Sequence, residues 1–148
     1  MRLPKDLREF VGSLNSSGVE YVIVGAFALA FHGFPRYTGD IDILVRRSAE
    51  NAERLIGAIA AFGFNSTNLS AGDFLEADRV IQLGVAPNRV DVLTSITGVE
   101  FEDVWRGRVP SELDGLAVSF IDKASFILNK KATGRTQDKA DIEALGAE

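Results

Sequence analysis

Two short apolar runs, rich in β-branched residues, constrain the fold of this chain most strongly. Residues 19–24 are almost wholly apolar. Residues 40–45 are otherwise apolar but carry two aspartates, Asp40 and Asp42. Such runs are typical of strands buried in a sheet. Gly25 breaks the first run, and residues 26–31 favour a helix. A strand, a short helix and a second strand in such quick succession indicate an α/β chain.

The rest of the chain continues this alternation. Helical spacing predicts a first helix near the N-terminus, and further strands and helices follow, with Asp122 and Thr136 as expected helix caps. The expected elements are a first helix from residue 3 that ends near residues 16–18, further helices over 48–62, 100–105, 122–132 and 137–145, and strands over 77–84, 89–93 and 116–120. We therefore expect an α/β (α+β) fold, with a mixed sheet of about five strands and flanking helices. The 148 residues suit one domain spanning 1–148, with a core over about 19–120 and C-terminal helices over about 121–146.

Composition excludes several kinds of site. The chain has no cysteine and a single histidine, so thiolate and multi-histidine metal sites are ruled out. A tightly bound metal would need oxygen ligands, which favours Mg²⁺ or Mn²⁺. The net charge of −5 argues against broad nucleic-acid binding, although residues 123–139 carry a local net charge of +4.

Three aspartates are the candidate metal ligands. Asp40 and Asp42 stand two residues apart in an expected strand, so both side chains lie on one face of the sheet. Asp91 lies between Val90 and Val92 in another expected strand, and the three carboxylates converge if the strands are neighbours. Such a group can hold two Mg²⁺ ions that activate a hydroxyl and bind a triphosphate.

The junction at Gly25-Ala26 is the candidate phosphate-binding turn. Glycine permits a tight turn there, and the helix that follows presents free backbone N–H groups toward an anion. In the loop before Asp40, Arg36 can reach a phosphate, neutralise the carboxylates or form a surface ion pair, and Thr38 orders the loop. His32, by contrast, is expected to sit at a helix C-terminus rather than to act in catalysis.

These motifs resemble a known family. Residues 22–26, His32-Gly33 and residues 36–45 are similar to the nucleotidyltransferases of the DNA polymerase β superfamily. Their signature is a hydrophobic strand, Gly-Gly or Gly-Ser, a spacer, Asp-x-Asp and a third acidic residue on a later strand. The resemblance is to the small bacterial and archaeal branch, which includes minimal nucleotidyltransferases and AbiEii-type toxin nucleotidyltransferases. Residues 130–142 are similar to that branch's closing motif.

The resemblance implies roles for individual residues. It implies that Asp40, Asp42 and Asp91 are catalytic metal ligands. The implied nucleotide contacts are Gly25, Ala26, Arg36, Thr38, Lys130 and Arg135. Ala26 departs from the family's usual Gly or Ser and cannot offer a hydroxyl to phosphate. Asp138 and Asp141 share a helix face and are expected to pair with Arg135 or Lys130.

The implied activity is transfer of a nucleoside monophosphate from ATP or another NTP to a hydroxyl, with Mg²⁺ or Mn²⁺. The acceptor stays open: it is a tRNA end, a partner protein or a small molecule. The partner also stays open, between a second copy of the chain in a homodimer and a cognate toxin–antitoxin protein. A non-catalytic binding or antitoxin subunit and a phosphohydrolase using the same metals are the alternatives. No apolar run is long enough to span a bilayer and the N-terminus lacks a signal-peptide core, so a cytoplasmic location is expected.

Overall fold

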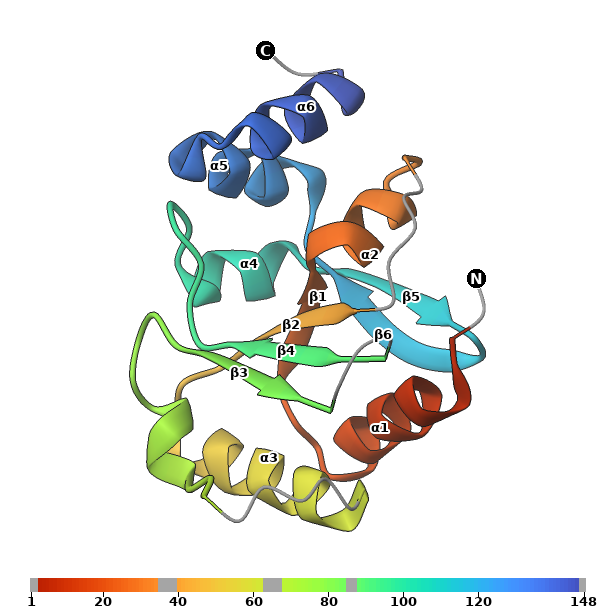
Figure 1. The fold of residues 1–148 in the computed structure, drawn as a ribbon, viewed down its shortest axis with the longest axis vertical. Helices are drawn as coiled ribbons and strands as arrows, with labels where there is room; N and C mark the ends of the chain where they lie inside the picture. The colour runs from red at the N-terminus through yellow and green to blue at the C-terminus, as the bar shows by residue number, and fades with distance from the viewer. Residues whose placement is uncertain (1–2, 35–39, 63–67, 85–87, 147–148) are drawn as a thin grey trace.

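The computed structural model describes residues 3–34, 40–62, 68–84 and 88–146. Six strands form one sheet in the order β3-β4-β2-β1-β6-β5 (Figure 1). The elements are α1 (Lys5–Ser16), β1 (Tyr21–Val24), α2 (Gly25–Phe31), β2 (Ile41–Val45), α3 (Ala49–Phe62), η1 (Ala71–Phe74), β3 (Val80–Leu83), β4 (Val90–Leu93), α4 (Phe101–Gly107), β5 (Val109–Leu113), β6 (Leu116–Phe120), α5 (Lys123–Thr133) and α6 (Thr136–Ala144).

The centre of the sheet comes from the apolar runs. All four residues of β1 are buried, and β1 pairs antiparallel with β2 and parallel with β6. β2 in turn pairs parallel with β4, so the sheet is mixed. The α/β class with a mixed sheet and flanking helices is therefore confirmed.

One strand is missing from the sequence-based prediction. β5 is a sixth strand at the edge of the sheet, and it contains Pro110. Proline cannot donate to a ladder, and it is tolerated in an edge strand. β5 joins β6 through Asp114-Gly115, both with positive φ (50° and 80°). Asp-Gly is a strong two-residue hairpin signal, and it marks this connection in the sequence.

The helices lie on two sides of the sheet. α1 and α3 pack side by side at one end of the molecule, where Phe10 and Phe62 meet edge to face with ring centroids 5.5 Å apart (Figure 1). α2, α5 and α6 lie toward the opposite end, and α5 packs on α6. None of the described helices has the length and apolar character needed to cross a membrane.

The two predicted helix caps have different outcomes. The Asp122 carboxylate accepts a hydrogen bond from the Ser125 N–H (3.2 Å), which confirms it as the cap of α5. The predicted cap of α6, Thr136, is wrong by one residue because α6 is capped at Arg135. The cause is Asp138, whose carboxylate accepts the Arg135 backbone N–H (3.1 Å) and draws that residue into the cap.

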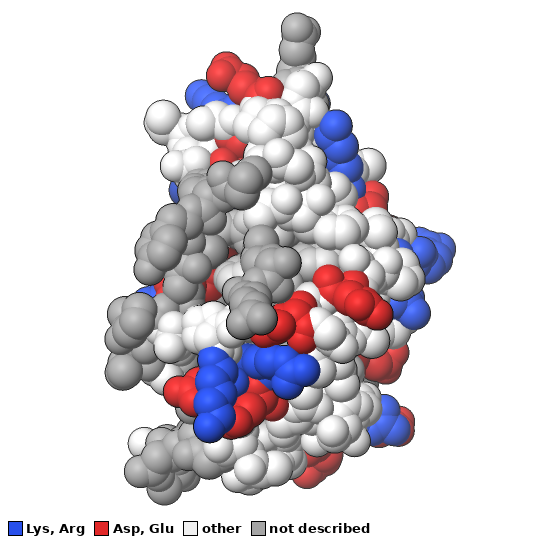
Figure 2. Space-filling model, turned by 90° about the vertical axis from the view of Figure 1, so that its right-hand side faces the viewer, with Lys and Arg blue, Asp and Glu red and all other residues white. Residues whose placement is uncertain are grey.

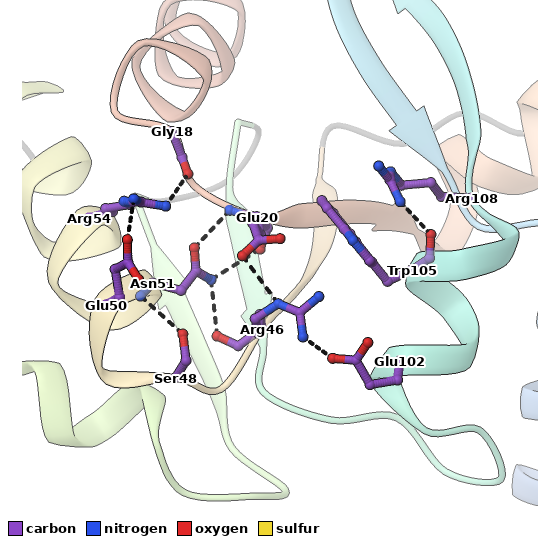
Figure 3. A network of polar contacts seen from close by, with 10 residues as sticks. All are labelled: Gly18, Glu20, Arg46, Ser48, Glu50, Asn51, Arg54, Glu102, Trp105 and Arg108. Carbon is purple, nitrogen blue, oxygen red and sulfur yellow. Dashed lines mark hydrogen bonds and ion pairs between the residues drawn. The ribbon is translucent and has the colours of Figure 1, made fainter.

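A polar network fixes the end of the β1–β2 pair that faces α3 (Figure 3). The buried Asn51 side chain accepts the Glu20 N–H at 2.7 Å and donates to the Glu20 and Arg46 carbonyls at 3.1 and 3.0 Å. The Arg46 side chain pairs with Glu20 and Glu102 and lies over the Phe101 ring. This network ties β1, β2, α3 and α4 together and leaves the other end of β2 to carry the acidic residues.

Candidate active site

Three aspartates meet where β2 and β4 run side by side. Asp42 and Asp91 are direct neighbours in the register of these parallel strands. Asp40 immediately precedes β2. Because alternate residues of a strand share a face, Asp40 lies on the same side as Asp42. The strands are neighbours as expected, so Asp42 lies beside Asp91, and Asp40 is close enough for its charge to act on Asp42.

Asp42 is electrostatically the most perturbed of these aspartates. The pKa of Asp42 is raised to about 7, most of all by burial and then by the charge and side-chain hydrogen bond of Asp91 and the charge of Asp40. Lys130 acts in the opposite direction and lowers it. Two adjacent carboxyl groups in a partly buried site cannot both ionise without cost, so they share a proton or need a cation.

The cation beside these carboxylates is Arg89, which the sequence reasoning did not single out. Its Nε and Nη2 donate to the two oxygens of Asp91 at 2.8 and 3.1 Å. The same Nη2 lies 3.1 Å from Asp40 Oδ2. Arg89 stands two residues before Asp91, so strand alternation was the available signal that both side chains share a face.

Gly25 lies directly against Asp42. Its φ is +69°, and a Cβ at this position would lie 2.1 Å from Asp42 Oδ2. No side chain fits there, so glycine is required both for the turn and for the close approach of the carboxylate. α2 begins at Gly25 itself, with Ala26 in its first turn.

A cavity of about 350 Å³ opens beside Asp42. One part of its wall is polar, with Asp42, Lys130 and Arg135, and another part is apolar, with Ile121 and Phe126. The sequence reasoning missed the small polar residues that also line it: Ser95, Thr97, Asn129 and Thr133. They lie near β4 and on α5, and no motif marks them. The cavity thus combines polar and apolar walls, as small-molecule sites commonly do.

Lys130 and Arg135 reach this cavity from a carboxylate network. Lys130 Nζ lies 3.4 Å from Asp138 Oδ1 and 3.8 Å from Asp141 Oδ2. Arg135 binds Asp138 through Nε and Nη2, at 2.8 and 3.1 Å. These bonds hold the pKa of the fully buried Asp138 well below its usual range. The expected pairing of Asp138 and Asp141 with these two basic residues is therefore confirmed.

Three other residues named from the sequence do not belong to this group of charged side chains in the described structure. Arg36 and Thr38 fall in residues 35–39, outside the described residues. His32 caps the C-terminus of α2 as expected, and its Nε2 lies 2.8 Å from the Ile121 carbonyl oxygen. On the described part of the face in Figure 2, Lys and Arg are interspersed with Asp and Glu.

The donor set suits a divalent metal in its chemistry, although it is not arranged as a metal site. Within the described segments, no three acidic or histidine side chains are placed together as a metal-ligand group. Arg89 already engages Asp40 and Asp91. The carboxylate oxygens are nevertheless the ligands that Mg²⁺ and Mn²⁺ prefer, and a cation would offset the burial and the neighbouring charges that raise the pKa of Asp42.

Comparison with known proteins gives structural matches only. No family profile matches the sequence, and no curated protein sequence matches it. A solved structure from Thermotoga maritima, described as a candidate nucleotidyltransferase, has a TM-score of 0.63 and 18% identity, covering 93% of this chain and 88% of that one. The lincosamide antibiotic adenylyltransferase LnuA, solved with lincomycin bound, has a TM-score of 0.62 and 14% identity, covering 99% and 98%.

These matches establish the fold class. The six-stranded mixed sheet with flanking helices is shared with these two nucleotidyltransferase structures. At identities below one fifth, the likeness concerns the fold alone.

Proposed function

We propose that this protein is a metal-dependent nucleotidyltransferase. The observation that carries the proposal is the pairing of Asp42 with Asp91 on parallel neighbouring strands, beside a cavity with polar and apolar walls. The similarity of fold to an adenylyltransferase supports the same reaction class.

Asp40, Asp42 and Asp91 would hold Mg²⁺ or Mn²⁺, two ions in the full arrangement. Bound there, the metal supplies charge stabilisation to the triphosphate and to the attacking hydroxyl. Gly25 lets the Asp42 carboxylate approach the start of α2, and the backbone N–H groups of Gly25 and Ala26 are the proposed phosphate contacts.

The remaining chemistry concerns the acceptor hydroxyl and the departing pyrophosphate. The hydroxyl oxygen forms a bond to the α-phosphorus of the NTP as the bond from that phosphorus to the β-phosphate oxygen breaks. Asp91 takes the hydroxyl proton, and pyrophosphate leaves. Lys130 and Arg135 line the cavity and would contact the negative phosphates, and Arg36 and Thr38 keep their proposed roles as nucleotide contacts.

The acceptor is proposed by class only. A hydroxyl on an RNA end, on a partner protein or on a small molecule would suit the site, and a second copy of the chain or a toxin–antitoxin partner would complete the cleft. The bound antibiotic of the similar adenylyltransferase makes small molecules the first class to test.

The test is incubation with each α-labelled NTP, Mg²⁺ and cell extract as the source of acceptor. Wild type is expected to transfer label, and Asp42→Asn is expected to lose the transfer. Label transfer that survives in Asp42→Asn would contradict the assigned site. A wild type that transfers nothing would favour a binding subunit, and release of free nucleotide or phosphate without an acceptor would favour a hydrolase.

A further inference from the structure

Arg89 occupies the space between two of the aspartates that are proposed to hold metal. Both oxygens of Asp91 accept from its guanidinium, and one oxygen of Asp40 lies 3.1 Å from the same Nη2. A planar guanidinium suits this bidentate contact better than any other side chain. Arg89 is therefore a counter-cation of Asp40 and Asp91.

Arg89 and a divalent cation would compete for the same carboxylate oxygens. A metal bound to Asp91 needs at least one of the oxygens that accept from Arg89, and at this distance the two cations would repel each other.

Different contacts hold the backbone and the side chain of Arg89. Its carbonyl oxygen accepts the Ile41 N–H at 3.0 Å, which fixes the main chain to β2. Its side chain is 31% exposed, so the guanidinium can turn into solvent without breaking the sheet. The fold thus allows Arg89 to leave the carboxylates while Asp91 stays in place.

We propose that Arg89 is an exchangeable counter-cation, which holds Asp40 and Asp91 until a divalent metal displaces it. The proposal rests on the metal site of the proposed function. Because displacement of Arg89 opposes metal binding, the affinity for free metal is lower than the three carboxylates alone would give.

The test measures Mn²⁺ binding to the whole protein at pH 8 by calorimetry, with the free ion counted by electron paramagnetic resonance. Arg89→Gln is expected to bind Mn²⁺ about tenfold or more tightly than wild type, since removing a neighbouring like charge changes a carboxylate's cation affinity on this scale. Arg54→Gln is the matched control, because it makes the same charge change where Arg54 pairs with Glu50 on α3 (Figure 3). Its Mn²⁺ affinity should stay within about twofold of wild type.

A second readout guards against a folding defect. Without metal, Arg89→Gln should melt below wild type because Asp91 loses its bidentate ion pair, and Mn²⁺ should raise its Tm by more than it raises that of wild type. Arg89→Lys keeps the charge without the planar fork, and its Mn²⁺ affinity should fall between those of wild type and Arg89→Gln.

The outcomes separate this inference from the proposed function. If Arg89→Gln binds Mn²⁺ with a Kd equal to or higher than that of wild type, the role of Arg89 is overturned and the metal site stands. If neither protein binds Mn²⁺ and Asp42→Asn behaves like both, the metal site fails and the role of Arg89 fails with it.

Discussion

Replacing Gly25 with alanine tests the contact that positions Asp42. The new Cβ would lie 2.1 Å from Asp42 Oδ2 and 2.9 Å from its Cγ, in a backbone conformation with φ of +69°. Left-handed geometry costs an L-residue roughly 1–2 kcal/mol. Pushing Asp42 off its rotamer costs about 0.5–1.5 kcal/mol more. We therefore expect Gly25→Ala to lower the free energy of unfolding by about 2–3 kcal/mol.

The assay is thermal and urea unfolding in EDTA. For a domain of this size, the loss corresponds to a fall in Tm of about 5–10 °C. The matched control is Gly57→Ala in α3, where a Cβ meets no atom within 4 Å and φ is not positive. That change should stabilise the protein by about 0.4–1 kcal/mol.

A double-mutant cycle isolates the contact with Asp42. In an Asp42→Ala background the carboxylate is gone, so Gly25→Ala should cost about 1 kcal/mol less than in wild type. A Gly25→Ala protein as stable as wild type, or an equal cost in both backgrounds, would refute the reasoning that the Asp42 carboxylate requires glycine here.

Three further predictions concern polar groups. Asn51→Ala removes three hydrogen bonds that hold Glu20 and Arg46, and urea unfolding should show a loss of about 2–4 kcal/mol; an effect below 1 kcal/mol would contradict the network. The pKa of Asp42 is raised to about 7 in the folded protein, so between about pH 4 and pH 7 the folded state holds a proton on Asp42 that the unfolded state releases. The stability that this proton contributes is therefore lost as the pH rises through about 7. Urea unfolding in EDTA at pH 5 and pH 8 should show this loss in wild type and a smaller one in Asp42→Asn, and equal losses would count against the shift. Asp138→Asn breaks a buried pairing with Lys130 and Arg135 and should cost about 3–5 kcal/mol, so a Tm unchanged from wild type would show that the pairing is not stabilising.

The central fold could be predicted because its strands carry their own signal. Residues 19–24 and 40–45 are apolar and β-branched, and burial on both faces of a sheet demands that composition. β5 lacked the signal because an edge strand needs few apolar residues, and Pro110 argued against a strand. The Asp114-Gly115 turn was the cue that an edge hairpin forms there.

The site was predictable where it depends on strand alternation. Spacing along a strand places Asp40 and Asp42 on one face, and Asp91 could be grouped with them only on the expectation that the two strands are neighbours. The same spacing places Arg89 on the face of Asp91, whereas its contact with Asp40 depends on the pairing of β2 with β4. Tertiary contacts of this kind also set the cap of α6, where Asp138 moves the helix start to Arg135.

The most direct test of nucleotidyl transfer compares two labels in one reaction. Wild-type protein is incubated with Mg²⁺, acceptor extract and NTP labelled either at the α-phosphate or at the γ-phosphate. Nucleotidyl transfer predicts that the α-label becomes attached to an acceptor and that the γ-label appears only in pyrophosphate, with both signals absent in Asp42→Asn. Attachment of the γ-label to an acceptor, or no attachment of either label with any NTP, would contradict it.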